Sequence, residues 1–342
     1  MDISLPQAVV LELTYKCNHK CMFCSCPWYA PNNKYPVRNE LNIKQWKEVI
    51  NKLYDHGVEI FSISGGEAIL KDGFIDIIKH IRAEGSIRGY NNVITLISNG
   101  LAMKDEYLSL FKELNVHLSM SLPGYSTFKE LTGVDNADGV LRWFRKAKEI
   151  GLKTTVNVTV TAINYHEIYE TISLGLINGA NDVLLNRFLP GGRGLMYKDQ
   201  LTLNHEQLNG MLDITEEILD LSNRRGNVGT EFPFCIINTP GKYQRLVIGT
   251  KCAAAKTFFV IGPSGEIRTC NHSPIIVGHI FDEEIITNKE YWNNFAHSNY
   301  KPIQCKSCNK MTICDCGCRE VANILSNDFT AIDPCISQII KE

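Results

Sequence analysis

Residues 8–28, AVVLELTYKCNHKCMFCSCPW, decide the architecture that we expect for this chain. The apolar run at 8–13 predicts a buried strand. The polar turn after it carries Cys17, Cys21 and Cys24 in CxxxCxxC spacing. Three thiolates can hold a four-iron, four-sulfur cluster while leaving one iron without a protein ligand, where a small molecule can bind. Unrelated buried thiols, or part of a zinc site, are the alternatives.

Composition and charge narrow the class of protein. The chain has 342 residues, which suits one large domain and a smaller one. Its formal net charge is −2 with no basic stripe, so we expect no nucleic-acid partner. No apolar run approaches the roughly 18–20 residues of a membrane span, and the first residues, MDISLPQ, lack the features of a signal peptide. Thirteen cysteines without an export signal predict a cytoplasmic protein whose thiols bind metal.

Apolar runs and helical periodicity alternate over the first two-thirds of the chain. The sequence predicts strands at 8–13, 58–64, 93–98, 116–122, 152–161 and 182–188. It predicts helices at 41–57, 73–84, 104–115, 138–151, 164–178 and about 205–223. Such alternation is typical of a parallel α/β sheet with right-handed crossovers. We therefore expect an open, partial (β/α)6 barrel of the TIM type over residues 1–230.

Polar motifs follow several of these strands. They are Gly65-Gly66-Glu67 after the second strand, Ser98-Asn99-Gly100 after the third, Ser121 near the end of the fourth and Asn186-Arg187 at the end of the sixth. Since active sites of such barrels lie at the carboxyl ends of the strands, these positions predict one shared site. Each motif by itself also fits an ordinary turn or a satisfied polar group. The LPGGRG segment after Arg187 either shapes a substrate entrance or turns the chain.

The cysteine loop, with Phe23 before its third cysteine, resembles the cluster loop of the radical S-adenosylmethionine (SAM) enzymes, and Gly65-Gly66-Glu67 is similar to their GGE segment. The resemblance implies that SAM chelates the open iron and is cleaved by one electron to a 5′-deoxyadenosyl radical. It also implies a flavodoxin- or ferredoxin-type electron donor. The expected cofactor-binding residues are Phe23, Gly65, Gly66, Glu67, Ser98, Asn99, Ser121 and Asn157.

Cysteines are concentrated again in residues 231–342, where we expect a small α+β domain. Seven of them follow one spacing: Cys252, then Gly265 after 12 residues, Cys270, Cys305-xx-Cys308, Cys314, Cys318 and Cys335. This arrangement resembles the seven-cysteine SPASM extension of many radical SAM peptide maturases. A zinc knuckle built on residues 305–318 is the alternative, and it leaves three of the seven cysteines without a role.

The SPASM resemblance implies two auxiliary [4Fe–4S] clusters. Their ligands would be Cys305, Cys308, Cys314 and Cys335 for the cluster farther from SAM, and Cys252, Cys270 and Cys318 for the nearer one. Two fully ligated clusters need eight thiolates, and the motif supplies seven. Cys235, expected in a short strand, is the preferred eighth ligand; Cys316, Cys26 or a substrate group are alternatives. If Cys235 is not a ligand, it could donate a hydrogen atom to a substrate radical.

The function implied by these resemblances is radical modification of a ribosomally made peptide or protein by crosslinking, oxidation or epimerisation. A radical SAM dehydrogenase or rearrangement enzyme for a small metabolite is the alternative, followed by a non-enzymatic metal scaffold. Asn271 follows Cys270 where sulfatase-maturing relatives carry an aspartate, so sulfatase maturation is not expected unless His272 acts as the base. The first strand begins by residue 8, so we expect the barrel alone or a separate leader-binding protein to hold the substrate.

Overall fold

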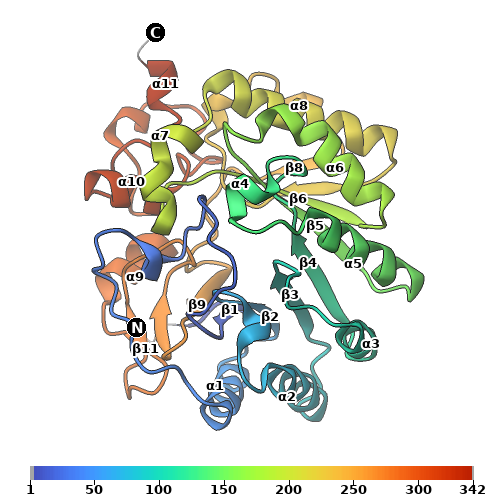
Figure 1. Ribbon diagram of the computed structural model, residues 1–342. Coiled ribbons are helices and arrows are strands. Elements are labelled where there is room, and N and C mark those ends of the chain that lie inside the picture. The colour runs from blue at the N-terminus through green and yellow to red at the C-terminus, as the bar shows by residue number, and fades with distance from the viewer. Residues whose placement is uncertain (1–3, 341–342) are drawn as a thin grey trace.

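The computed structural model describes residues 4–340, and within this range eleven strands form one sheet (Figure 1). The strand order is β11-β10-β9-β1-β2-β3-β4-β5-β6-β7-β8. The first six strands along the chain are β1 (Ala8–Glu12), β2 (Ile60–Ser64), β3 (Val93–Ser98), β4 (Val116–Ser121), β5 (Thr154–Val160) and β6 (Asp182–Arg187). Neighbours among these six pair in parallel, which confirms the predicted parallel α/β barrel architecture.

Helices connect these strands and cover the outer face of the curved sheet (Figure 1). The main ones are α1 (Ile43–Asp55), α2 (Phe74–Ile87), α3 (Asp105–Glu113), α5 (Ala137–Glu149), α6 (Ile168–Ile177) and α8 (His205–Leu221). Helix α1 begins with a capping box, in which Asn42 and Gln45 accept hydrogen bonds from each other's backbone N–H. It buries Trp46, Val49 and Ile50 on the face that the sequence periodicity predicts.

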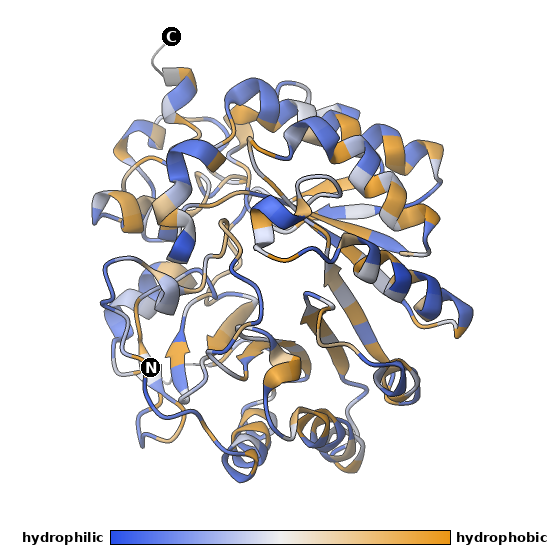
Figure 2. Cartoon of the chain, in the orientation of Figure 1, coloured by the Kyte–Doolittle hydropathy of each residue, from blue (hydrophilic) through white to orange (hydrophobic). Residues whose placement is uncertain are grey.

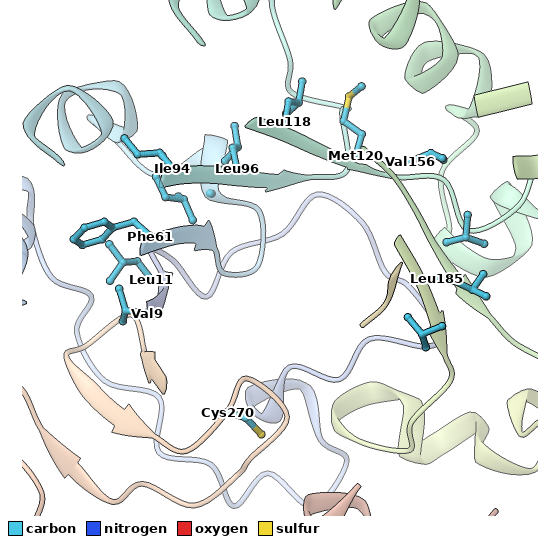
Figure 3. Packing of buried hydrophobic residues seen from close by; sticks show 14 of the residues in the cluster. Val9, Leu11, Phe61, Ile94, Leu96, Leu118, Met120, Val156, Leu185 and Cys270 are labelled. Carbon is cyan, nitrogen blue, oxygen red and sulfur yellow. The ribbon is translucent and has the colours of Figure 1, made fainter. Parts of the chain in front are cut away.

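Side chains of the strands alternate between two environments. In β5, the residues at 154, 156, 158 and 160 are buried, and those at 155, 157 and 159 are half-buried. This period of two places one row against the helices and the other toward the barrel interior. Figure 3 shows the apolar row, with side chains such as Leu11, Phe61 and Leu96 packing on neighbouring strands. The strands are mainly hydrophobic and the outer helices amphipathic (Figure 2).

The carboxyl third extends the sheet at both edges, which the sequence does not predict. Strands β7 (Gly226–Val228) and β8 (Leu246–Ile248) continue it in parallel beyond β6. At the other edge, β9 (Phe258–Ile261) pairs in parallel with β1 and is followed by antiparallel β10 (Glu266–Arg268) and β11 (Gly278–His279). The proposed boundary at residue 230 thus lies between two paired strands of one sheet.

Short helices and irregular segments make up most of the remaining chain. The short helices are α4 (Phe128–Thr132), α7 (Lys198–Leu201), α9 (Lys289–Ala296), α10 (Arg319–Ser326) and α11 (Ser337–Ile340), and the 3-10 turns used below are η4 (Gly192–Tyr197) and η5 (Phe234–Ile236). Most of the cysteines of the carboxyl third lie outside regular elements. Between residues 4 and 340, no helix has the length and apolar character needed to cross a bilayer.

Candidate active site

A cavity of about 390 Å3 opens at the carboxyl ends of the barrel strands. It brings together two groups of three cysteines that lie far apart in the sequence. These are Cys17, Cys21 and Cys24 from the loop after β1, and Cys252, Cys270 and Cys318 from the carboxyl third. The cavity therefore joins the two cysteine regions in a single chamber.

The amino-terminal cysteine loop is held on both sides by backbone hydrogen bonds. Lys20 and Met22 donate their N–H groups to the carbonyls of Thr132 and Leu131 at the end of α4. On the other side, Gly194 of η4 donates to the Cys24 carbonyl, and Arg193 donates to the Cys21 carbonyl. These hydrogen bonds thus hold the loop against the barrel.

The chemistry of this loop fits an iron–sulfur cluster. Burial raises the pKa of Cys17 to about 11 and that of Cys21 still further, so their thiolates need a nearby cation. A hydrogen bond with the Cys26 thiol lowers the pKa of Cys24 to about 7. His19 Nε2 is also buried at this cavity without a hydrogen-bond partner. Three buried thiols on one loop fit an iron–sulfur cluster, because the positive charge of iron would stabilise them as thiolates.

The two glycines after β2 approach the cysteine loop itself. Gly66 donates its N–H to the Thr14 carbonyl at 2.7 Å, and a Cβ added at Gly66 would overlap the carbonyl of Lys16. At Gly65 the backbone has a φ of 137°, which favours glycine. The glycines therefore let the β2 turn pack against the backbone of the loop while both also line the cavity.

Glu67 lies at the centre of a buried hydrogen-bond network on the cavity wall. Its carboxylate accepts from Ser98 Oγ at 2.9 Å, from the Asn99 N–H at 2.8 Å and from the Ile69 N–H at 3.4 Å. Burial raises the pKa of Glu67 to about 7. The Asn99 side chain in turn donates to Asn18 Oδ1 in the cysteine loop. Glu67 and Ser98 thus bind each other and tie β2 to β3, and this network is joined to the cysteine loop.

Phe23, Ser121 and Asn157, the other expected cofactor-binding residues, do not all line the cavity. Phe23 and Ser121 line the cavity. Asn157 does not: its Oδ1 accepts a hydrogen bond at 2.9 Å from Nδ2 of Asn186, and Asn186 lines the cavity. Asn157 is thus joined to the chamber through Asn186, and its contact with the cofactor stays a prediction.

Loops from the carboxyl third position Cys252, Cys270 and Cys318. The Cys252 N–H donates to Asp315 Oδ2 at 3.1 Å, and the Cys318 N–H donates to Asp333 Oδ2 at 2.7 Å. Burial raises the pKa of Cys318 to about 12 and those of the other two thiols well above their usual value. These thiols have the same need for a cationic partner as the amino-terminal group.

A second, smaller cavity of about 60 Å3 holds another group of cysteines: Cys235, Cys305, Cys308, Cys314 and Cys316. Cys335 lines a neighbouring cavity with Arg187 and Asp333. Cys235 is exposed and lies in η5 rather than in a strand. Cys235 thus lies beside Cys305, Cys308 and Cys314, three of the cysteines expected to bind the cluster farther from SAM. The structure does not bring Cys235 to Cys252, because the turn at η5 packs against Cys314, whose Sγ accepts the Phe234 N–H.

His272 lies buried in the wall of the central cavity. Its Nε2 is 3.0 Å from the Pro190 carbonyl, which can only accept, so Nε2 carries the proton and Nδ1 is left as an acceptor. Burial lowers the pKa of His272 to about 4, and the ring is neutral near pH 7. The residue proposed as a substitute base is therefore held in one tautomer beside Cys270.

Sequence reasoning missed two buried ion pairs next to the cavity. Glu12 pairs with Arg268, whose guanidinium lies over the rings of Trp28 and Tyr35 at 5.9 and 5.6 Å from their centroids. Arg187, at the end of β6, pairs with Asp333 at 2.6 Å. A charged Glu12 inside the apolar run AVVLELT is a signal that could have indicated the first pair.

No group of three or more His, Cys, Asp or Glu side chains within residues 4–340 forms a site for a single metal ion. The thirteen cysteines are all unpaired.

Comparison with known proteins identifies the family. A sequence profile described as the radical SAM superfamily matches residues 11–175, the segment from β1 into α6. The matched segment, residues 11–175, therefore belongs to the radical SAM superfamily. The chain is 28% identical over 338 residues to the PqqA peptide cyclase of Xanthomonas euvesicatoria pv. vesicatoria (strain 85-10), covering 96% of this chain and 87% of that protein. It is 26% identical to the PqqA peptide cyclase of Bradyrhizobium diazoefficiens, covering 96% and 86%.

Solved structures of low sequence identity share the fold. Streptococcus suis SuiB bound to its precursor peptide SuiA superimposes with a TM-score of 0.71 at 17% identity, over 97% of this chain and 76% of SuiB. Native anSMEcpe with bound AdoMet gives a TM-score of 0.76 at 14% identity, over 98% and 96%. The shared fold therefore extends through the carboxyl third. The profile match and the similarity to proteins named as peptide cyclases together make this chain a radical SAM enzyme.

Proposed function

We propose that this enzyme modifies a ribosomally made peptide in the central cavity by radical chemistry. The observation that carries the proposal is that Cys17, Cys21 and Cys24 share one chamber with Cys252, Cys270 and Cys318. Relatives covering nearly the whole chain are named as peptide cyclases, and SuiB was solved with a precursor peptide bound. Crosslinking, oxidation and epimerisation are the reactions in view, with a small metabolite as the alternative substrate.

The cofactors proposed are SAM and three [4Fe–4S] clusters. Bound at the cluster of Cys17, Cys21 and Cys24, SAM supplies the 5′-deoxyadenosyl radical. The residues proposed to shape its pocket are Phe23, Gly65, Gly66, Glu67, Ser98, Asn99 and Ser121, which all line the cavity. The auxiliary clusters are assigned to Cys252, Cys270 and Cys318, and to Cys305, Cys308, Cys314 and Cys335. Two auxiliary clusters suit an oxidation, since the electron of a substrate radical then has an exit.

The chain's own residues contribute position and proton chemistry. The network of Glu67, Ser98 and Asn99 fixes the loop and strand ends that face SAM. Neutral His272, with Nδ1 free to accept, lies beside Cys270 as a candidate proton acceptor. Walls from the barrel and the carboxyl third enclose the chamber and limit access of water to a radical.

Partners and location are also proposals. A flavodoxin- or ferredoxin-type protein would deliver the electron, and a separate leader-binding protein could present the peptide. The reducing cytoplasm remains the expected location, supported by thirteen cysteines without a disulfide among them.

Metal analysis after anaerobic reconstitution tests the cofactors. We expect about twelve irons per chain, whereas about eight would favour a single auxiliary cluster and the metabolite alternative. Zinc in place of iron, or failure to form 5′-deoxyadenosine from SAM and dithionite, would overturn the proposal.

Mass spectrometry of a co-expressed peptide encoded beside the gene tests the substrate. Loss of two hydrogen atoms would support crosslinking or oxidation. An unchanged mass with deuterium uptake from solvent would support epimerisation. An unmodified peptide, together with turnover of a small metabolite, would overturn the peptide assignment.

A further inference from the structure

The cluster assigned to Cys252, Cys270 and Cys318 needs a fourth ligand, and the structure moves the cysteine candidates away from it. Cys235 and Cys316 line the second cavity. Cys26 lines the central cavity, but its thiol contacts the Gly65 carbonyl at 3.7 Å beside the amino-terminal loop. A different donor on the wall of the central chamber is therefore required if the ligand comes from the protein.

Four carboxylates line this chamber, and three of them are engaged by side chains. Glu12 pairs with Arg268, Glu67 accepts from Ser98, and Glu320 accepts from Thr269 and Tyr291. Glu231 is the fourth. Within residues 4–340 no side chain donates a hydrogen bond to the Glu231 carboxylate, which lies near the backbone N–H groups of Ala253 and of Glu231 itself. Since Ala253 directly follows Cys252 and both line the chamber, the Glu231 carboxylate lies close to Cys252.

The buried ion pair between Arg187 and Asp333 connects the backbone of Glu231 to the backbone of Cys318. Arg187 donates through Nε and Nη2 to the Glu231 backbone carbonyl at 3.1 and 3.0 Å. The same guanidinium pairs with Asp333, which accepts the Cys318 N–H. Three links thus fix the distance between the two residues, and neither position depends on a flexible surface side chain.

The Glu231 carboxylate shares its chamber with the thiols of Cys252, Cys270 and Cys318. Arg187 is a nearby cation, but it also pairs with Asp333, so it offsets only part of this negative charge. Packing a carboxylate against three potential thiolates in a buried chamber costs free energy unless a cation compensates. Iron compensates the charge, and a carboxylate oxygen is an acceptable ligand for it.

We propose that the Glu231 carboxylate is the fourth protein ligand of the iron–sulfur cluster held by Cys252, Cys270 and Cys318. This inference rests on the proposed function, which assigns a cluster to those cysteines. It makes this cluster a three-cysteine, one-carboxylate site that is closed by the protein rather than by the substrate.

The test isolates this cluster in the full-length chain. Alanine replaces the cysteines at 17, 21 and 24 and at 305 and 308, leaving one cluster to be reconstituted. Glu231→Ala, Glu231→Gln and Glu231→Cys are then compared with the parent. After mild ferricyanide oxidation, we expect the parent to keep four irons. Glu231→Ala should lose about one of them and show the paramagnetic signal of a three-iron cluster.

The thiolate variant sharpens the test. Glu231→Cys should keep all four irons and lower the reduction potential of the cluster, because a thiolate donates more charge to iron than a carboxylate. Glu320→Gln is the control, since it removes a carboxylate from the same chamber that is already hydrogen-bonded; it should keep the parent spectrum.

The possible outcomes distinguish failure of the Glu231 ligand from failure of the cluster assignment at Cys252, Cys270 and Cys318. If Glu231→Ala and Glu231→Gln keep the parent iron count and spectrum, Glu231 is not a ligand and the inference fails alone. If Cys252→Ala leaves the iron content unchanged, no cluster is bound there and the proposed assignment fails first. Circular dichroism of each variant excludes unfolding, and Glu231→Cys still decides the question if Glu231→Ala does not fold.

Discussion

The two cysteine regions are held in different ways. Cys17, Cys21 and Cys24 lie in a loop joined to α4 and η4 by backbone hydrogen bonds and directly follow a strand of the barrel. The cysteines at 305, 308 and 314 lie in a segment without α-helix or strand between residues 297 and 318, and Cys308 is exposed. We infer that the barrel preforms the first site, while the second depends on its metal for order.

Replacing one cysteine in each region should give the largest and most different effects. Cys17→Ala should lower 5′-deoxyadenosine formation by more than about 100-fold, since even outer contacts of a metal site are worth about 10–100-fold. Cys308→Ala should lose iron from the second cavity and still cleave SAM. Anaerobic SAM cleavage and iron analysis measure both, and Cys26→Ala is the control for iron content. Equal loss of SAM cleavage in both variants would contradict the comparison.

Removing iron should expose the carboxyl-terminal cysteine segment and spare the barrel. Trypsin should cut at Lys306 and Lys310, which are exposed, at least about tenfold faster in the iron-free protein than in the reconstituted one. Cleavage at Lys104 and Lys112, which are exposed on the barrel, should not change. Mass spectrometry of timed digests gives both rates. If the iron-free chain is cut equally at all four sites, the barrel is not preformed.

Asp333→Asn should break the connection between the barrel and the carboxyl third. It leaves buried Arg187 without its ion-pair partner, which costs about 3–5 kcal/mol of unfolding free energy. Urea unfolding of the reconstituted protein measures the loss. The control is Asp213→Asn, whose ion pair with Lys242 is about half exposed and should contribute less than about 1 kcal/mol. Similar values for the two variants would show that the buried pair does not join the regions.

Gly66→Ala tests how tightly the barrel holds the first loop. The new Cβ would overlap the Lys16 carbonyl, so the loop must shift at a cost of about 1–3 kcal/mol, with weaker SAM binding. Gly241→Ala is the matched control because nothing lies within 4 Å of an added Cβ there. Thermal unfolding and a SAM-binding titration report the effect. Unaltered SAM binding in Gly66→Ala would mean that the loop adapts freely.

The pH dependence of stability should contain a contribution from Glu67. Its folded pKa of about 7 lies above the usual value of 4.5, so the folded state binds more protons between these values. The unfolding free energy should therefore fall as pH rises from 4.5 to 7, by about 2–3 kcal/mol from this group. Urea unfolding of the iron-free protein at pH 5 and pH 7 checks this, and Glu67→Gln should flatten the difference. A wild-type protein that becomes more stable from pH 5 to pH 7, relative to Glu67→Gln, would contradict the predicted sign.

Much of the site could be predicted because its motifs are local. The CxxxCxxC loop, Gly65-Gly66-Glu67, Ser98 and Asn99 each follow a strand directly, and parallel strands bring their carboxyl ends to one edge. Asn157 lies outside the residues that line the chamber and is joined to it by a hydrogen bond with Asn186 on the neighbouring strand. Cys235 lies in a 3-10 turn rather than in the expected strand, and it lines the second cavity with Cys305, Cys308 and Cys314. Both placements depend on contacts between separate segments, which no local motif specifies.

The amino-acid sequence by itself determined the alternation of strands and helices, the cysteine spacings and the family of the enzyme. These features depend on residues close together in the chain, where geometry follows from spacing. The tertiary structure decided which thiols share a chamber, how the carboxyl third extends both sheet edges, and where Glu231 lies. Arg187 and Asp333, which join these parts, are 146 residues apart. Contacts at such separations depend on strand register and loop packing, which no local pattern specifies.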